Sequence, residues 1–114
     1  MKIAIKRAYD EPAAADGYRV LVDRLWPRGV KKELLGLDEW CKDVAPSAEL
    51  RVWFGHEPAK FQEFSARYLT ELEQSTAPAE LLKRAKGDTL TLVYAARDPQ
   101  VNHAVVLRDF LSHL

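Results

Sequence analysis

One stretch near the C-terminus constrains the fold of this chain more than any other. Residues Thr89–Ala95, TLTLVYA, form a nearly continuous apolar run. Such a run is typical of a β-strand that is covered on both faces, and strands of this kind occur in parallel sheets with helices on each side. The run therefore predicts an α/β protein.

Two earlier segments are also predicted to be strands. Ile3–Lys6 mixes apolar and charged residues over a short stretch, and Tyr18–Asp23 is rich in β-branched and aromatic residues. Leu37–Val44 fits either a short strand or a helical turn, and the sequence leaves that choice open.

Helices are predicted between and after these strands. Ser47 is a favourable N-cap, and the large apolar residues after Pro58 repeat every three or four positions. Pro78 suits the first turn of another helix, for which Gly87 is the stop signal, and a last helix begins near Asn102. Because strands separated by helices require crossover connections, we predict one small three-layer α/β domain with a short, mostly parallel sheet flanked by helices.

The composition is that of an ordinary globular domain. The chain has 114 residues, of which 47% are apolar and 30% are charged. Lys plus Arg and Asp plus Glu both number 17, so the net charge indicates no polyanion-binding surface over the whole molecule but leaves room for a local basic patch. The single cysteine, Cys41, cannot form an internal disulfide, and no apolar run is long enough to span a membrane. We therefore expect a soluble cytoplasmic protein without a membrane partner, and its oligomeric state stays open.

Candidate functional residues follow two of the predicted strands. Asp23–Gly29 (DRLWPRG) comes after the second strand, and Arg97–His103 (RDPQVNH) lies between the last strand and the last helix. Ligands of open parallel sheets bind outside the carboxyl ends of the strands, and a helix N-terminus there favours anions. Since guanidinium groups suit carboxylates and phosphates, we predict a pocket for a small anionic or nucleotide-like ligand. The residues predicted to bind it are Arg7, Arg24, Trp26, Arg28, Ser47 and Asn102.

Acid–base catalysis is the activity that these segments would allow. His103 is a candidate general base near neutral pH, with Asp98 as the candidate acidic partner and Asp23 as the alternative. Cys41 has no histidine beside it, so no nucleophile is predicted. The three scattered histidines and one cysteine give no metal-ligand spacing, and the sequence identifies no cofactor. Whether the chain is an enzyme therefore stays open.

The same residues also have purely structural interpretations. Trp26 is typical of a packed residue, and Arg24 and Arg28 are typical of an ion-pair network. Asp98 before a proline suits a turn or an N-cap, and a single helical histidine such as His103 is often a hydrogen-bonded structural residue. On this hypothesis the motifs determine the fold and carry no activity.

A further hypothesis is a non-catalytic module that binds nucleic acid or a protein. Arginines 7, 24 and 28 with Lys31 and Lys32 would form a local basic edge, and Trp26 would be available for stacking. A concave pocket with Arg24, Arg28 and His103 converging would favour the small ligand. A flat basic strip with an exposed Trp26 would favour nucleic acid.

Four motifs in order resemble the signatures of the YeaO-like proteins, an uncharacterised family known as a domain of unknown function. They are Tyr18–Gly29 (YRVLVDRLWPRG), Ala45–Phe54 (APSAELRVWF), Phe64–Leu72 (FSARYLTEL) and Tyr94–Ala104 (YAARDPQVNHA). The similarity covers essentially the whole chain. It implies no established activity.

The resemblance does bear on cysteine chemistry. Longer relatives in the wider group carry, after the corresponding strand, a cysteine, an acidic residue and a Cys-His-Arg triplet. This chain has alanines at 95 and 96 and the run Val101–Ala104 at the matching positions, so the histidine is retained and the cysteines and the arginine are absent. The resemblance therefore argues against a cysteine nucleophile or a thiol–metal site. The strand–loop–helix is also loosely similar to the phosphate-binding loop of rhodaneses and cysteine phosphatases, which supports anion binding at most.

Overall fold

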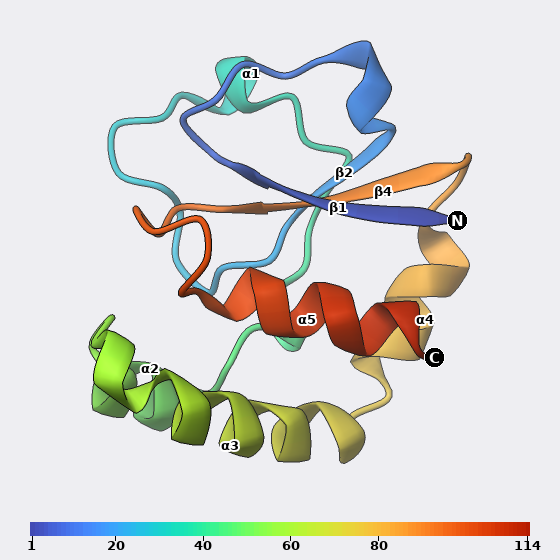
Figure 1. Cartoon of the computed structure of the whole chain (residues 1–114). Helices are drawn as coiled ribbons and strands as arrows, with labels where there is room; N and C mark the ends of the chain where they lie inside the picture. Colours follow the sequence, from blue (N-terminus) through green and yellow to red (C-terminus); the bar gives the residue numbers. More distant parts are fainter.

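The computed structural model describes all 114 residues and contains a four-stranded parallel sheet (Figure 1). Its strands are β1 (Lys2–Arg7), β2 (Tyr18–Leu21), β3 (Glu39–Trp40) and β4 (Thr89–Tyr94), and they lie in the order β1-β4-β2-β3. Strand β4 therefore lies between β1 and β2, and its residues from Leu90 onward are buried. The prediction of a buried strand in a parallel sheet is confirmed.

Five helices surround this sheet. They are α1 (Lys32–Leu35), α2 (Ala48–Phe54), α3 (Phe61–Glu73), α4 (Ala77–Arg84) and α5 (His103–Ser112), with short 3-10 segments at Ala14–Asp16, Lys42–Val44 and Pro58–Lys60. Figure 1 shows α5 against one face of the sheet, α2 and α3 beyond α5, and α1 on the opposite side. The three predicted layers are present but unequal, because only one four-residue helix and loops cover the second face.

The core follows this asymmetry. The main cluster of 18 buried residues fills the space between the sheet and the helices α2 to α5, and a second cluster of four lies under α1. The second cluster consists of Ala8, Leu21, Leu35 and Val93, with Trp26 packed against it. None of the helices is both long enough and apolar enough to cross a membrane.

Three segments differ from the predicted bounds. Leu37–Val44 contains both of the alternatives, since the two-residue strand β3 is followed by a 3-10 turn. Strand β2 ends at Leu21, although the Val22 amide still donates to the Val93 carbonyl oxygen at 3.0 Å. The prediction that Gly87 stops helix α4 is wrong, because the chain becomes extended already at Ala85, whose side chain is buried in the core.

A partly buried ion cluster joins the turn before β2 to the strands. The carboxylate of Asp16 accepts bonds from Lys6 and from Arg19 (2.6 Å), and Arg19 also donates to the Leu35 and Gly36 carbonyl oxygens. Burial alone would raise the pKa of Asp16, but the Ala13 amide, Lys6 and Arg19 together lower it below its ordinary value. The charged form of Asp16 therefore stabilises the folded state.

Candidate functional site

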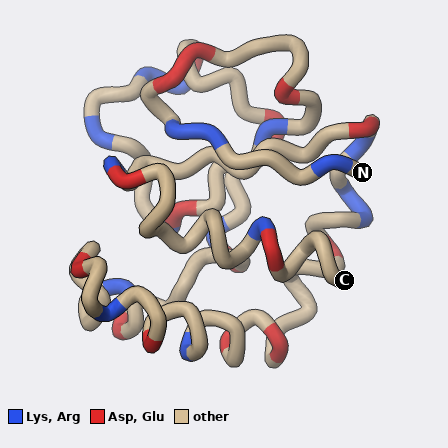
Figure 2. Tube along the Cα trace, viewed as in Figure 1, with Lys and Arg blue, Asp and Glu red and all other residues tan.

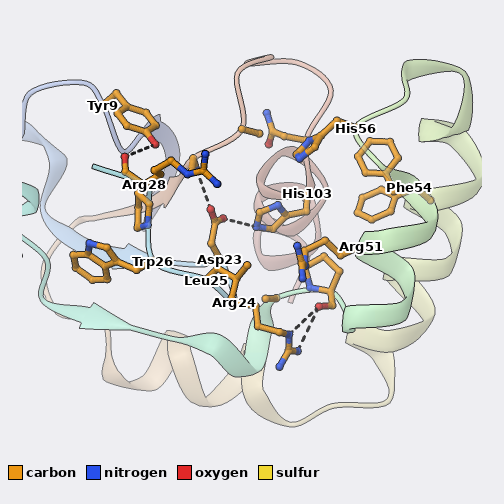
Figure 3. A pocket seen from close by; sticks show the side chains of 17 residues that line it. Tyr9, Asp23, Arg24, Leu25, Trp26, Arg28, Arg51, Phe54, His56 and His103 are labelled. Carbon is orange, nitrogen blue, oxygen red and sulfur yellow. Dashed lines mark hydrogen bonds and ion pairs between the residues drawn. The ribbon is translucent and has the colours of Figure 1, made fainter. Parts of the chain in front are cut away.

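A cavity of about 390 Å³ lies at the carboxyl edge of the sheet (Figure 3). One wall is the loop after β2, the opposite wall is α2 with the turn that follows it, and the floor is formed by the end of β4 and the start of α5. Because β2 and β4 are adjacent and parallel, the segments that follow them meet at one edge of the sheet, as predicted.

Most of the predicted site residues line this cavity. They are Arg24, Trp26, Arg28, Asn102 and His103. The remaining lining residues are mainly apolar, and there is no Ser, Thr, Cys or Lys side chain among all 17.

Three predicted site residues lie outside the cavity and have bonds of their own. Arg7 donates through Nε to the Ala96 carbonyl oxygen at 2.8 Å, which ties β1 to the loop after β4. The Ser47 hydroxyl caps helix α2 and donates to Glu71 at 2.7 Å. The Asp98 carboxylate accepts from the Gln100 and Val101 amides at 2.8 and 3.1 Å. Such a short acidic turn is a local structure, and Asp98 does not contact His103.

His103 is instead paired with Asp23 at the centre of the floor (Figure 3). Its Nε2 lies 3.1 Å from Asp23 Oδ1 and 3.1 Å from the Val22 carbonyl oxygen. The other carboxylate oxygen of Asp23 accepts from the Ala95 amide at 3.0 Å. The His103 and Asp23 side chains are 15% and 16% exposed, so the pair is screened from bulk water but still reaches the cavity.

Asn102 positions His103 without being free for a ligand. Its side chain is 1% exposed, accepts from the Val105 amide at 3.1 Å and donates to the Asp98 carbonyl oxygen at 2.7 Å. Asn102 is therefore the N-cap of α5, and this cap fixes His103 as the first residue of the helix.

Trp26 is a packed residue at the edge of the cavity. Its indole Nε1 donates to the Val30 carbonyl oxygen at 2.7 Å, and its ring meets that of Trp40 edge-on with centroids 5.3 Å apart. The Trp40 indole in turn donates to the Asp23 carbonyl oxygen at 2.7 Å. The two indoles therefore hold the loop that carries Asp23, Arg24 and Arg28.

The arginines divide into two groups by their partners. Four of the nine form ion pairs with carboxylates, namely Arg19, Arg67, Arg84 and Arg108. Five have no carboxylate partner: Arg24, Arg28 and Arg51 line the cavity, Arg7 supports its floor, and Arg97 follows β4. Charges of both signs are interspersed along the trace (Figure 2).

The side chains that helix α2 and the following turn contribute to the cavity were not among the predicted site residues. Arg51 and His56 are exposed side chains that line the cavity. His56 is also the one residue other than glycine with a positive φ, at 58°. No sequence signal identifies this wall, because it meets the floor only after α2 has packed against α3, which in turn packs against α5.

The structure contains no group of three His, Cys, Asp or Glu side chains placed to hold a metal ion. Cys41 is buried and away from the cavity, and burial together with the nearby Glu39 raises the pKa of its thiol. The thiol is thus unsuited to act as a nucleophile.

Fold and site together define a small parallel α/β domain with an arginine-lined cavity at the strand ends. The chain belongs to the family described as "Inactive DUF488-N3 subclade", whose model matches residues 2–114. It is 49% identical over 115 residues to Uncharacterized protein YeaO of Escherichia coli (strain K12), with both chains covered in full. It is 45% identical to Uncharacterized protein Rv3073c of Mycobacterium tuberculosis (strain ATCC 25618 / H37Rv), over 97% of this chain and 94% of that one. The YeaO-like resemblance is therefore confirmed. No solved structure matches the chain.

Proposed function

We propose that this protein binds a small anionic ligand in the cavity without forming a covalent bond to it. The observation that carries the proposal is the lining of the cavity by Arg24, Arg28 and Arg51, none of which has a carboxylate partner in the chain. Arg28 and Arg51 are exposed to solvent, and guanidinium groups without a carboxylate partner are suited to bind an anion.

The one carboxylate in the cavity does not balance these charges. Asp23 accepts a hydrogen bond from the Ala95 amide, lies 3.1 Å from His103 Nε2 and forms no ion pair with any of the three arginines. Arg24 has only two long bonds of 3.4 Å to the Pro46 carbonyl oxygen, and the side chains of Arg28 and Arg51 have no hydrogen-bond partner in the chain. The donors of Arg28 and Arg51 are therefore available to a ligand.

Binding rather than covalent catalysis fits the chemistry of the lining. The cavity contains no thiol, aliphatic hydroxyl or amine side chain that could attack a substrate. The description of the family as inactive agrees with this composition. The predicted catalytic pair of His103 and Asp98 has no support in the geometry, because Asp98 faces its own turn.

A small ligand also fits the shape better than a nucleic-acid strand. Arg24, Arg28 and Arg51 line a cavity of about 390 Å³, which is within the usual range of small-molecule sites. The indole of Trp26 is half-buried and bonded to Val30, so it is not a free stacking platform.

Thermal-shift and calorimetric titrations would test the proposal with phosphorylated metabolites, dicarboxylates and short oligonucleotides. A ligand at 100 times its Kd should stabilise the wild type by about 2.7 kcal/mol. We expect Arg28→Gln and Arg51→Gln to remain folded and to lose most of this effect. Arg97→Gln is the matched control, since Arg97 is equally unpaired but lies outside the cavity. Equal losses in all three variants, or stabilisation by oligonucleotides alone, would contradict the proposal.

A further inference from the structure

We infer that the ligand carries a phosphate monoester, and that His103 contacts this group through Nδ1 and takes up a proton as it binds. This inference rests on the proposed binding function. It adds the chemical class of the ligand and the residue that recognises its second negative charge.

The surroundings of His103 fix which ring nitrogen faces the ligand. Nε2 lies 3.1 Å from the Val22 carbonyl oxygen and 3.1 Å from Asp23 Oδ1, and both oxygens are acceptors while Asp23 is ionised. The proton of a neutral ring must therefore be on Nε2. Nδ1 has no partner in the chain, and His103 lines the cavity, so Nδ1 is the nitrogen left for a ligand.

Asp23 places a buried carboxylate oxygen beside the ring. Its Oδ1 is fully buried and receives no aligned hydrogen bond, because the Nε2–H bond is directed at the Val22 carbonyl oxygen. A buried carboxylate oxygen without a donor is costly, and a charged imidazolium 3.1 Å away offsets that cost. The carboxylate cannot rotate away, since the Ala95 amide holds its other oxygen.

Several charged or titratable groups face His103 besides Asp23. Arg24, Arg28, Arg51 and His56 line the same cavity as His103, which is itself the first residue of α5. Tyr68 meets the ring edge-on at 6.2 Å, and because burial raises the pKa of its hydroxyl well above the ordinary value, it stays neutral. A dianion bound beside the unpartnered Nδ1 would favour the charged ring, so binding should draw a proton onto Nδ1.

The directions of the donors favour phosphate over carboxylate. Arg28 on the loop after β2 and Arg51 on α2 lie on opposite sides of the Asp23–His103 pair, with His56 on a third side (Figure 3). A carboxylate offers two oxygens in one plane, whereas a phosphate monoester presents three non-bridging oxygens in different directions and carries nearly two charges at neutral pH. The arrangement of the donors therefore matches a phosphate monoester.

Three simple probes separate charge from shape, namely phenyl phosphate, phenyl sulfate and benzoate. Phenyl sulfate is tetrahedral but singly charged, and benzoate is planar. We expect phenyl phosphate to bind the full-length protein at least about tenfold more tightly than either, since one additional charge-assisted hydrogen bond contributes about 1.5–3 kcal/mol. Equal affinities for the three probes would overturn the assignment of a phosphate monoester.

Proton uptake on binding of phenyl phosphate is measured between about pH 7.5 and 9. In this range the phosphate, with a second pKa near 6, is already dianionic. If binding takes up one proton, affinity falls as pH rises, with a slope approaching one log unit per pH unit. Calorimetry in buffers of different ionisation enthalpy counts the same proton. His103→Gln should abolish both signals, whereas Arg97→Gln, which changes a cationic side chain outside the cavity, should retain them.

The outcomes distinguish this inference from the binding function. Phosphate binding that depends on Arg28 and Arg51 but takes up no proton, or takes one up equally in His103→Gln, overturns the role of His103 and leaves the binding function intact. Binding of none of the three probes, or binding that Arg28→Gln and Arg51→Gln do not weaken, counts against both. Direct NMR titration of the His103 ring with and without phenyl phosphate provides an independent readout.

Discussion

The hydroxyl of Tyr68 gives a stability prediction whose size follows from its burial. Tyr68 on α3 has 0% of its surface exposed, and its hydroxyl donates to the carbonyl oxygen of Val44, which is also fully buried. Tyr68→Phe removes the donor and leaves that carbonyl without a partner in the apolar core. The loss of one partner of a buried hydrogen bond costs about 1–3 kcal/mol.

The expected change in melting temperature follows from the length of the chain. With an unfolding entropy of about 2.1 cal/mol/K per residue, 114 residues give about 0.24 kcal/mol/K, so the variant should melt about 4–12 °C lower. Differential scanning calorimetry or thermal denaturation followed by circular dichroism would measure this shift.

Tyr9→Phe is the matched control for this substitution. The Tyr9 hydroxyl also donates to a carbonyl oxygen, that of Arg28 at 3.0 Å, but the residue is 48% exposed. Water can replace the lost bond, so we expect a change of less than about 0.5 kcal/mol, or about 2 °C. If Tyr68→Phe lowered the melting temperature no more than Tyr9→Phe, burial would not determine the cost of the lost bond and the reasoning would be refuted.

Three further predictions concern other parts of the fold. Gly17→Ala should destabilise the protein by several kcal/mol, because the new Cβ would collide with the Thr89 carbonyl oxygen. Gly87→Ala, also at positive φ but in open space, should cost about 1 kcal/mol. Urea denaturation of both variants would compare the two losses of stability. Since folding lowers the pKa of Asp16, the stabilisation by its carboxylate is present above about pH 4 and is lost as pH falls through the pKa of the folded state. In Asp16→Asn the acid-induced loss of unfolding free energy should therefore be smaller. An unchanged dependence of stability on pH would argue against the ion cluster. The Cys41 thiol should react with iodoacetamide at pH 8 much more slowly in the native protein than in urea, and equal rates by mass spectrometry would show that it is not buried.

Much of the fold could be predicted from local patterns. The apolar run after Asp88 identified β4, and the alternation of strands and helices predicted a parallel sheet. The choice of helix ends was less secure, as at Ala85, where burial of a side chain ended α4 before the glycine that the sequence favoured. Local preferences of a few tenths of a kcal/mol are easily outweighed by packing in the core.

The candidate site was predictable only in part. Arg24, Arg28 and His103 were found because they follow strands whose carboxyl ends must meet at one edge of a parallel sheet. Asp98 was the first candidate partner of His103 and Asp23 the alternative. The Asp98 carboxylate bonds the amides of its own turn, and Asp23 is the carboxylate that lies beside His103. Short acidic residues before such turns satisfy local amides first, and sequence proximity gives no information on this competition.

The sequence by itself determined which segments are buried, which edge of the sheet is polar and which cationic side chains lie there. These properties depend on the periodicity and composition of single segments. Only the tertiary structure decided the strand order β1-β4-β2-β3, the pairing of Asp23 with His103 and the placement of Arg51 and His56 on the wall opposite Arg28. Each of these contacts joins segments far apart in the chain, and its geometry is set by how the helices pack across the sheet, which no single segment encodes.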